Sequence, residues 1–413
     1  MKFNTFFYKE TNFKETSIGK IPKDWKVAEL REIGNLKDGD WILKENYTDS
    51  GVRLLQIGDI GVGRFLDKSN RFISLERAKE LKCTFVRPEE DILISRMPDP
   101  IGRACLAPKL PYPYIVAVDI TILRVKKEVA NPEYIVYILN APLTLKEVEK
   151  LASGATRRRI SRRNLEKIKI PLPPLNEQKA IAQILFVVDK AIWKTDEIIT
   201  KTKRLKKGLI RELLTKGIGH KEFKDTEIGR IPKEWEVTKL GNVVDFENGR
   251  RPRIILERGR IPIYGAGGLA GYTQESVINQ DFILVIARVG VGSVGKVYLA
   301  KGAVWISDNA IYSKCYNSSR VYLPFVYYLL MFKRLDRLIS RSGAGGYAII
   351  TQSSLRNIRI QLPKLHEQRK IAEILSTVDK KLEIERKRKK KLERIRKGLM
   401  DLLLTGKVRV KVS

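Results

Sequence analysis

The chain contains 413 residues, of which 80 are lysine or arginine and 47 are aspartate or glutamate, so its formal net charge is +33. This length suits two or three domains. A hydrophobic share of 43% is enough to build cores, which excludes a wholly disordered protein. So large an excess of positive charge indicates a polyanionic partner, most often nucleic acid, although a ribosome-bound or membrane-surface protein would also be basic.

The rare residue types exclude several kinds of site. Three cysteines without a CxxC pair and two isolated histidines rule out a disulfide framework, a thiolate zinc site and a three-histidine metal site. The N-terminal segment lacks the apolar core of a signal peptide, and no run reaches the roughly 18–20 apolar residues of a membrane helix. We therefore expect a soluble, cytoplasmic protein without a membrane partner.

The chain contains an internal repeat. NFKETSIGKIPKDWKVAEL (12–30) returns as EFKDTEIGRIPKEWEVTKL (222–240), at an offset of 210 residues. LEKIKIPLPPLNEQKAIAQIL (165–185) returns as LRNIRIQLPKLHEQRKIAEIL (355–375), at an offset of 190. A period near 200 residues is too long for a solenoid and indicates a duplicated domain with its connector.

Each copy begins with β-rich runs punctuated by glycine and proline. These runs are RLLQIGDI, DILISRM and YIVAVDITILRV in the first copy, and FILVIARV and AVWISDNAIYSK in the second. PEYIVYILN (132–140) predicts a short helix, and PFVYYLLMF is its counterpart. The pattern predicts a mixed α+β globular domain in each copy.

A helix of about 40 residues, roughly 55–60 Å long, is predicted after each globular segment. The prolines at 173 and 174 stop a strand, Glu177 suits a first helical turn, and Gly217 and Gly406 suit helix C-termini. Apolar residues recur every three or four positions in both helices. The predicted interface residues are Ile181, Leu185, Val188, Ile192, Leu205 and Leu209, with Ile371, Leu375, Val378, Leu382, Ile395 and Leu399.

A helix this long with a narrow apolar stripe needs a partner along its length. The matching stripes favour pairing of the two helices with each other. We expect the pair to be antiparallel, because the domain between the helices can return the chain. Two separate surface helices are the alternative. We thus expect two α+β domains (1–172 and 218–362), related by a pseudo-twofold axis and separated by an antiparallel coiled coil of two long helices (173–217 and 363–413, with the C-terminal tail). The N-terminal segment, which has no helix before it, should lie near the end of the second helix.

Arginine clusters are the candidate contacts to DNA. Two similar domains can place equivalent surfaces in grooves about one helical turn, ~34–36 Å, apart. Lysine and arginine give affinity through counterion release, whereas sequence is read at base edges, so we expect base readout where the two copies differ. The candidates are Arg157, Arg158, Arg159, Arg162 and Arg163 in the first copy, and Arg250, Arg251, Arg253 and Tyr347 in the second. A solvated face is the alternative for each cluster, and is the favoured interpretation of the basic run ERKRKKKLERIRK (385–397).

Three patterns resemble catalytic motifs but lack their context. GVGSVG (290–295) matches the dinucleotide-binding GxGxxG, but a strand-like segment follows it, so a tight β turn is the better interpretation. NPEY (131–134) resembles the NPPY motif of adenine methyltransferases without its second proline, and a capped helix start with proline at the first position explains it. Pro98-Asp99 lacks the ExK of a nuclease motif. We expect no catalytic centre.

The paired segments resemble the specificity subunit of Type I restriction–modification systems over nearly the whole chain. IGKIPKDWKVAEL and IGRIPKEWEVTKL, the PLPPLNEQ and QLPKLHEQ stretches, and the helices ending in LLTKG and LLLTG carry this resemblance. It implies two target recognition domains that each read half of a bipartite, asymmetric site in double-stranded DNA, and helices that set the gap and dock two modification subunits. Those subunits would carry S-adenosylmethionine and methylate adenine N6, and restriction subunits would add translocation with ATP and Mg²⁺, so this chain would hold no cofactor. Gln361 and Lys364 replace two of the motif's prolines, which leaves open by a residue or two where the second helix begins.

Two other classes stay open from the residues alone. The first is a self-contained DNA methyltransferase or nuclease, which methyl transfer by the purified chain would favour. The second is a basic architectural coiled-coil protein without sequence choice, which uniform affinity across DNA sequences would favour.

Overall fold

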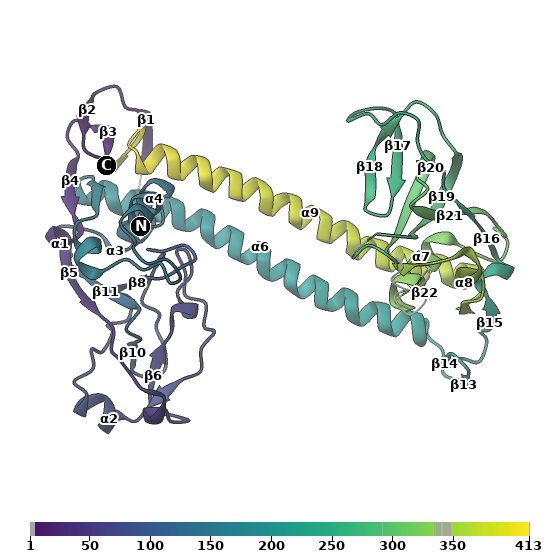
Figure 1. Cartoon of the computed structure of the whole chain (residues 1–413), viewed down its shortest axis with the longest axis horizontal. Coiled ribbons are helices and arrows are strands. Elements are labelled where there is room, and N and C mark those ends of the chain that lie inside the picture. The colour runs from purple at the N-terminus through teal and green to yellow at the C-terminus, as the bar shows by residue number, and fades with distance from the viewer. Residues whose placement is uncertain (1–4, 291, 334, 336–339, 342–347, 413) are drawn as a thin grey trace. The chain divides into compact units, whose positions relative to one another are not determined.

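The structure is a computed structural model that describes residues 5–290, 292–333, 335, 340–341 and 348–412. It divides into two compact units, residues 1–194 with 389–413 (unit 1) and residues 195–388 (unit 2). Each unit contains one globular domain and part of both long helices (Figure 1).

The globular part of unit 1 is built from several small sheets and short helices. Its largest sheet has the strand order β5-β11-β8-β9, and a second sheet has the order β10-β6-β7, in which β10 and β6 are parallel. The elements before the first long helix are β1 (Thr5–Lys9), β2 (Phe13–Thr16), β3 (Gly19–Pro22), β4 (Lys26–Glu29), α1 (Leu30–Ile33), β5 (Gly34–Asp38), β6 (Val52–Leu55), β7 (Phe72–Ile73), α2 (Leu75–Glu80), β8 (Asp91–Ser95), β9 (Ala104–Leu106), β10 (Tyr114–Val116), β11 (Ile120–Val125), α3 (Pro132–Leu139), α4 (Pro142–Lys150), α5 (Arg162–Glu166) and β12 (Lys169–Leu172).

The globular part of unit 2 has a sheet with the strand order β16-β21-β19-β20-β17-β18, in which β17 and β20 are parallel. Its elements are β13 (Phe223–Thr226), β14 (Gly229–Pro232), β15 (Glu236–Lys239), β16 (Val244–Asn248), β17 (Ile261–Gly265), β18 (Gly268–Thr273), β19 (Ile278–Ala287), β20 (Val297–Ile306), β21 (Ala310–Tyr316), α7 (Leu323–Lys333), β22 (Ser340–Arg341), β23 (Ala348–Ile349), α8 (Gln352–Arg356) and β24 (Arg359–Leu362). The expected α+β class is confirmed in both units.

Two local predictions from the sequence are confirmed. The Asn131 side chain accepts a hydrogen bond from the Tyr134 N–H at 2.9 Å and Pro132 begins α3, so NPEY is a capped helix start. The described residues of GVGSVG connect the antiparallel strands β19 and β20, and the Ser293 N–H donates to the Gly290 carbonyl at 3.1 Å. This segment is therefore a turn between strands.

The run YIVAVDITILRV consists of two strands rather than one. β10 ends at Val116 and β11 begins at Ile120, because the Ile120 N–H donates to the Ala117 carbonyl at 2.9 Å and closes a turn. AVWISDNAIYSK divides in the same way between β20 and β21, where the Ala310 N–H donates to the Ser307 carbonyl at 3.0 Å. A β-rich composition does not reveal such a turn when its residues are themselves apolar.

The two long helices are α6 (Leu175–Thr215) and α9 (Leu365–Leu404). They begin 365 − 175 = 190 residues apart, so the departures from the proline motif do not move the start of α9. Gly217 and Gly406 follow the helix ends with φ of 67° and 70°, the left-handed conformation that glycine adopts without strain.

The helices α6 and α9 pair antiparallel, as the stripes predicted (Figure 1). In unit 1, Leu185 shares a core with Leu403, and Asp189, further along α6, pairs with Arg396, which lies earlier in α9. In unit 2, Leu213 shares a core with Ile371, and Lys206 pairs with Asp379.

The buried seam of α6 keeps the alternating 4–3 spacing of a heptad repeat. It continues from Ile192 and Ile199 through the polar residues Thr202 and Lys206. Leu205 is one position out of this register and 56% exposed, and Ile395 of α9 is likewise 43% exposed. The structure therefore places these two predicted interface residues outside the seam. The other predicted residues are buried or half-buried: Ile181, Leu185, Val188, Ile192, Leu209, Ile371, Leu375, Val378, Leu382 and Leu399.

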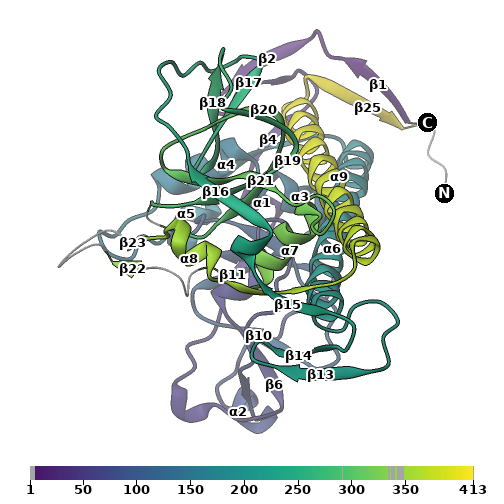
Figure 2. The same ribbon diagram turned by 90° about the vertical axis from the view of Figure 1, so that its right-hand side faces the viewer.

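The two ends of the described chain meet in unit 1. β1 pairs antiparallel with β25 (Val408–Val412), and Phe7 lies opposite Val410 (Figure 2). The N-terminal segment thus lies beside the end of the second long helix, as the repeat predicted. Within the described part of the chain, no helix is long and apolar enough to cross a membrane.

Candidate nucleic-acid interface

The turn between β10 and β11 holds the loop that follows β5 in unit 1. The Gly39 N–H donates to the Ile120 carbonyl and the Asp40 N–H to the Val116 carbonyl, both at 2.8 Å. The carbonyl oxygen of Ala117 occupies the space that a Cβ on Gly39 would need, so only glycine allows this approach. The loop is therefore fixed where it leaves the sheet.

Arg96 follows β8 and binds the same turn. Its N–H donates to the Asp119 carbonyl at 2.9 Å, and its guanidinium donates to Asp38 at 3.3 Å and to the Val118 carbonyl. The side chain is buried, and burial lowers the pKa of this guanidinium, an effect that the Asp38 carboxylate opposes.

The arginine-rich loop of unit 1 is the third segment that meets this turn. The Ile160 N–H donates to the Arg96 carbonyl at 3.0 Å, and Arg159 pairs with Asp119 at 3.1 Å. The turn at 116–120 therefore joins the loop after β5, the residue after β8 and the segment before α5. We call this arrangement the loop junction.

The predicted arginines of unit 1 differ in their surroundings. Arg158 pairs with Glu149 at 2.9 Å, and Arg162 pairs with Glu166 at 3.4 Å. Arg159 is half-buried, whereas Arg157 and Arg163 are exposed. All five lie on the segment 157–163, which contacts the loop junction through Arg159 and Ile160 and continues into α5.

Unit 2 repeats the loop junction with the same backbone hydrogen bonds. The Gly249 N–H donates to the Ala310 carbonyl at 2.9 Å, and the Arg250 N–H donates to the Ile306 carbonyl at 2.8 Å. The Arg288 N–H donates to the Asn309 carbonyl at 2.9 Å, and the Arg288 carbonyl accepts from the Ile350 N–H at 3.0 Å. The residues of the two loop junctions are therefore equivalent in the sequence repeat, since 249 − 39 = 210 and 350 − 160 = 190.

The predicted arginines of unit 2 lie on a different arm of the loop junction. Arg250, Arg251 and Arg253 are exposed on the loop after β16, the counterpart of the loop after β5. The Arg250 carbonyl accepts a hydrogen bond from the Trp305 indole at 2.8 Å, which fixes this loop. Tyr347 lies outside the described residues.

Sequence reasoning missed Arg96 and Arg288, which anchor the two loop junctions. A signal for them was present: each follows an apolar strand, in LIS-Arg and VIA-Arg, in both copies. It also missed Trp41, which lies on the same loop as Asp40 and has no aromatic counterpart in the second copy. The repeat alignment places it opposite Arg251, since 251 − 41 = 210.

The Glu-Gln pair of each proline motif attaches a globular domain to a long helix. Glu177 accepts a hydrogen bond from the Trp25 indole at 3.1 Å, and Gln178 donates to the Pro173 carbonyl at 2.8 Å. In unit 2, Glu367 accepts from the Trp235 indole at 3.0 Å. The same attachment is therefore made twice from repeated residues.

Further along each helix, a tyrosine and a cation meet one aspartate. Tyr137 donates to Asp189 at 3.0 Å, beside the ion pair of Asp189 with Arg396 at 2.5 Å. Tyr328 and Lys206 meet Asp379 in the same way, at 2.9 and 2.6 Å. Because 396 − 206 and 379 − 189 both equal 190, unit 2 repeats the contact of unit 1 with the roles of α6 and α9 exchanged.

The chain contains two copies of an α+β domain, and a long helix follows each copy. The two long helices pair with each other. This architecture defines a class of targeting proteins with two domains joined by a helix pair. A family model described as Type I restriction modification DNA specificity domain matches residues 22–203 and 232–394. The chain belongs to this family, whose members are non-catalytic targeting subunits of Type I restriction systems.

Similar proteins agree with this assignment. The chain is 32% identical to the MjaX and 31% identical to the MjaVIII type I restriction enzyme specificity subunit, both from Methanocaldococcus jannaschii, and each match covers 98% of both proteins. A crystal structure of the S subunit of a Type I restriction–modification system from M. genitalium has the same fold, with a TM-score of 0.66 at 21% identity over 92% of this chain and 96% of that one.

Proposed function

We propose that the chain recognises a bipartite, asymmetric sequence in double-stranded DNA, and that each unit reads one half-site. The observation that carries this proposal is the repeated loop junction. The same backbone hydrogen bonds hold loops whose side chains differ, with five arginines before and within α5 in unit 1 and three after β16 in unit 2. Side chains at base edges carry the sequence information, so unlike side chains on one scaffold support unlike half-sites.

The net charge of +33 supports affinity for the phosphate backbone. Each phosphate that lysine or arginine neutralises releases condensed counterions, so affinity falls steeply with salt concentration. The exposed side chains of Arg157, Arg163 and Arg251 are suited to this contact, whereas Arg158, Arg159 and Arg162 would first have to leave their carboxylate partners.

The paired helices α6 and α9 are proposed to set the gap between half-sites and to dock two modification subunits, with restriction subunits joining the same assembly. Their matching stripes and exchanged contacts at Asp189 and Asp379 support equivalent docking surfaces on the two helices. S-adenosylmethionine, ATP and Mg²⁺ are assigned to these partners, and this chain supplies the target. The cytoplasm is the proposed location.

An exchange of one recognition segment tests the proposal. The full chain is co-expressed with the modification subunits of its system, and methylated adenines are mapped across the genome. Exchanging residues 35–160 for the same segment of another family member should change one half of the methylated sequence and leave the other half and the gap unchanged. Methylation that follows no bipartite sequence, or an exchange that alters both halves, would contradict the proposal.

A further inference from the structure

Trp41 is the most exposed large hydrophobic side chain among the described residues, at 71%. An exposed indole is unfavourable in water, and tryptophan is enriched among the residues that contribute most to binding at interfaces. Trp41 lies on the loop after β5, directly after the two residues that the loop junction of unit 1 fixes. Its position is therefore set by the same turn that holds the arginine-rich segment.

The backbone on both sides of Trp41 is held in place. Asp40 is tied to the Val116 carbonyl through its N–H, and its carboxylate accepts a hydrogen bond from the Thr84 N–H at 2.9 Å. Ile42 packs partly buried against the core that contains Leu54 and Ile73. An indole presented between two anchored residues loses little conformational freedom on binding, so more of its burial appears as affinity.

The charges around Trp41 are compatible with DNA. Asp38 and Asp40, the acidic residues that precede it, are both engaged, Asp38 by Arg96 and Thr121 and Asp40 by Thr84. Lys44 and Glu45 follow on the same loop and are both exposed, so together they add no net charge. In unit 2 the position of Trp41 belongs to Arg251, on the loop that carries Arg250 and Arg253. The same arm of the loop junction thus presents an indole in unit 1 and cations in unit 2.

We infer that Trp41 is a specificity-determining residue, which makes an apolar contact with a base of the half-site read by unit 1. The inference rests on the proposed function. Apolar side chains contact the thymine methyl group in the major groove, and aromatic rings stack on unpaired or partly unstacked bases. An indole neutralises no phosphate, so its contribution to affinity does not depend on salt, in contrast to the contribution of Arg251.

The test uses the full chain, assembled with the modification subunits of its system, and a random duplex library from which the wild-type target is selected. Trp41→Ala should weaken binding to the selected target about thirtyfold, the middle of the range for removing one aromatic contact to a base. It should relax sequence preference within one half-site and leave the slope of log affinity against log salt unchanged. Trp41→Phe should retain most of the affinity. Arg251→Ala should reduce the magnitude of the slope by ~0.9.

Leu143→Ala is the matched control, because Leu143 is an apolar side chain in α4 of the same unit and is 65% exposed. It should leave affinity and target unchanged. Affinity within twofold of wild type in Trp41→Ala, an equal loss in Leu143→Ala, or a loss of the same factor on every duplex sequence would each overturn the inference. If wild type selects no bipartite target, the proposed function fails and the inference with it; if wild type selects one and Trp41→Ala selects the same one with the same affinity, only the inference fails.

Discussion

Glu177 at the start of α6 and Glu367 at the start of α9 are equivalent residues that each bind a tryptophan of a globular domain, but their other neighbours differ. Glu177 accepts from the Trp25 indole and is also bound by Arg409, which donates two hydrogen bonds to it at 2.7 and 2.8 Å. Glu367 accepts from the Trp235 indole, the Ile218 N–H and the His220 ring. One buried carboxylate is thus neutralised by a guanidinium, and the other is bound by backbone and ring groups.

The chain connects the segments around the two glutamates differently. In unit 2, α6 continues along the chain into β13, so His220 reaches Glu367 from a covalently connected segment. In unit 1 the corresponding segments are β25 at one end of the chain and β1 at the other. Arg409 of β25 joins them, because it also donates to Glu10 at 2.6 Å and to Asp24 at 2.8 and 2.9 Å. We call this cluster of ion pairs (Glu10, Asp24, Glu177 and Arg409) the terminal clasp.

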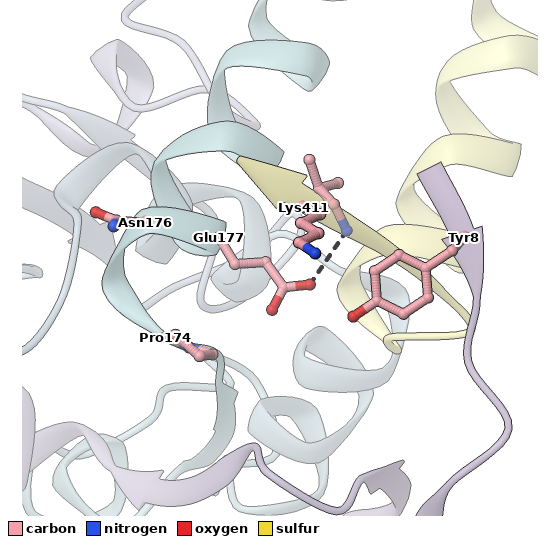
Figure 3. Close-up of a pocket in the computed structure, with 6 residues that line it drawn as sticks. Tyr8, Pro174, Asn176, Glu177 and Lys411 are labelled. Carbon is pink, nitrogen blue, oxygen red and sulfur yellow. Dashed lines mark hydrogen bonds between the residues drawn. The ribbon is translucent and has the colours of Figure 1, made fainter. Parts of the chain in front are cut away.

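Arg409 and Glu177 form the buried part of the terminal clasp, and Asp24 lies at its exposed edge. Burial acts to lower the pKa of Arg409, but the hydrogen bonds that it donates to Glu177 and Asp24 outweigh burial and raise it. The guanidinium also lies 5.5 Å from the centre of the Trp25 ring, the same indole that donates to Glu177. In Figure 3 the Glu177 carboxylate points from the start of α6 toward β25, with Tyr8 of β1 on the other side.

Of the changes considered, removing Arg409 should cause the largest loss of stability in unit 1. Arg409→Ala leaves the buried Glu177 without its cation, and an uncompensated buried charge costs about 3–5 kcal/mol. Hydrogen exchange of amides in β25 and the first turns of α6 should accelerate accordingly, while amides of unit 2 keep their protection. Lys407→Ala, which removes the exposed pair with Asp401, is the control and should cost less than about 1 kcal/mol. Equal acceleration in both units would show that the terminal clasp does not stabilise unit 1 specifically.

Neutralising Glu177 and Glu367 one at a time measures how much stability each gains from its own surroundings. Glu177→Gln keeps an oxygen for the indole but deprives Arg409 of a charged partner, and we expect a loss of about 2–3 kcal/mol, the worth of charged hydrogen bonds. Glu367→Gln removes no guanidinium partner and should cost about 1 kcal/mol. Urea denaturation of each variant, with hydrogen exchange to assign the unit that opens, measures both values. A larger loss in Glu367→Gln would refute the account given for the two helix starts.

Lowering the pH should weaken the terminal clasp, with a smaller loss of stability than either kind of substitution. The hydrogen bond from Arg409 lowers the pKa of Asp24 below its ordinary 3.8, and the Asn12 N–H, assisted by Arg409, lowers that of Glu10 below 4.5. A depressed carboxyl pKa adds stability above the ordinary pKa, and this stability is lost as pH falls through the folded value. Asp24 is 55% exposed, so solvent screens its share. Protection of β25 amides from hydrogen exchange should be constant above about pH 4.5 and fall below it. In Arg409→Ala this fall should be shallower. Identical pH profiles in wild type and variant would refute the contribution of Glu10 and Asp24.

The sequence by itself determined the duplicated organisation, the helix pair and the site of the N-terminal segment. Those features depend on patterns that repeat along the chain: the 190- and 210-residue offsets, the apolar stripes, and the glycines after each helix. The two helices start 190 residues apart because local residues at each start, a proline and a Glu-Gln pair, act on their own neighbourhood.

Only the tertiary structure decided which polar residues meet. Leu205 looked like an interface residue because it is apolar, but the heptad register assigns that place to Lys206, whose charge is neutralised by Asp379 on the other helix. Arg409 acquires its partners from positions 232 to 399 residues away in the chain, and Trp41 takes its place from a turn within YIVAVDITILRV that composition conceals. Charges and hydrogen bonds depend on the distances between groups, and those distances are fixed only when separate segments of the chain fold against one another.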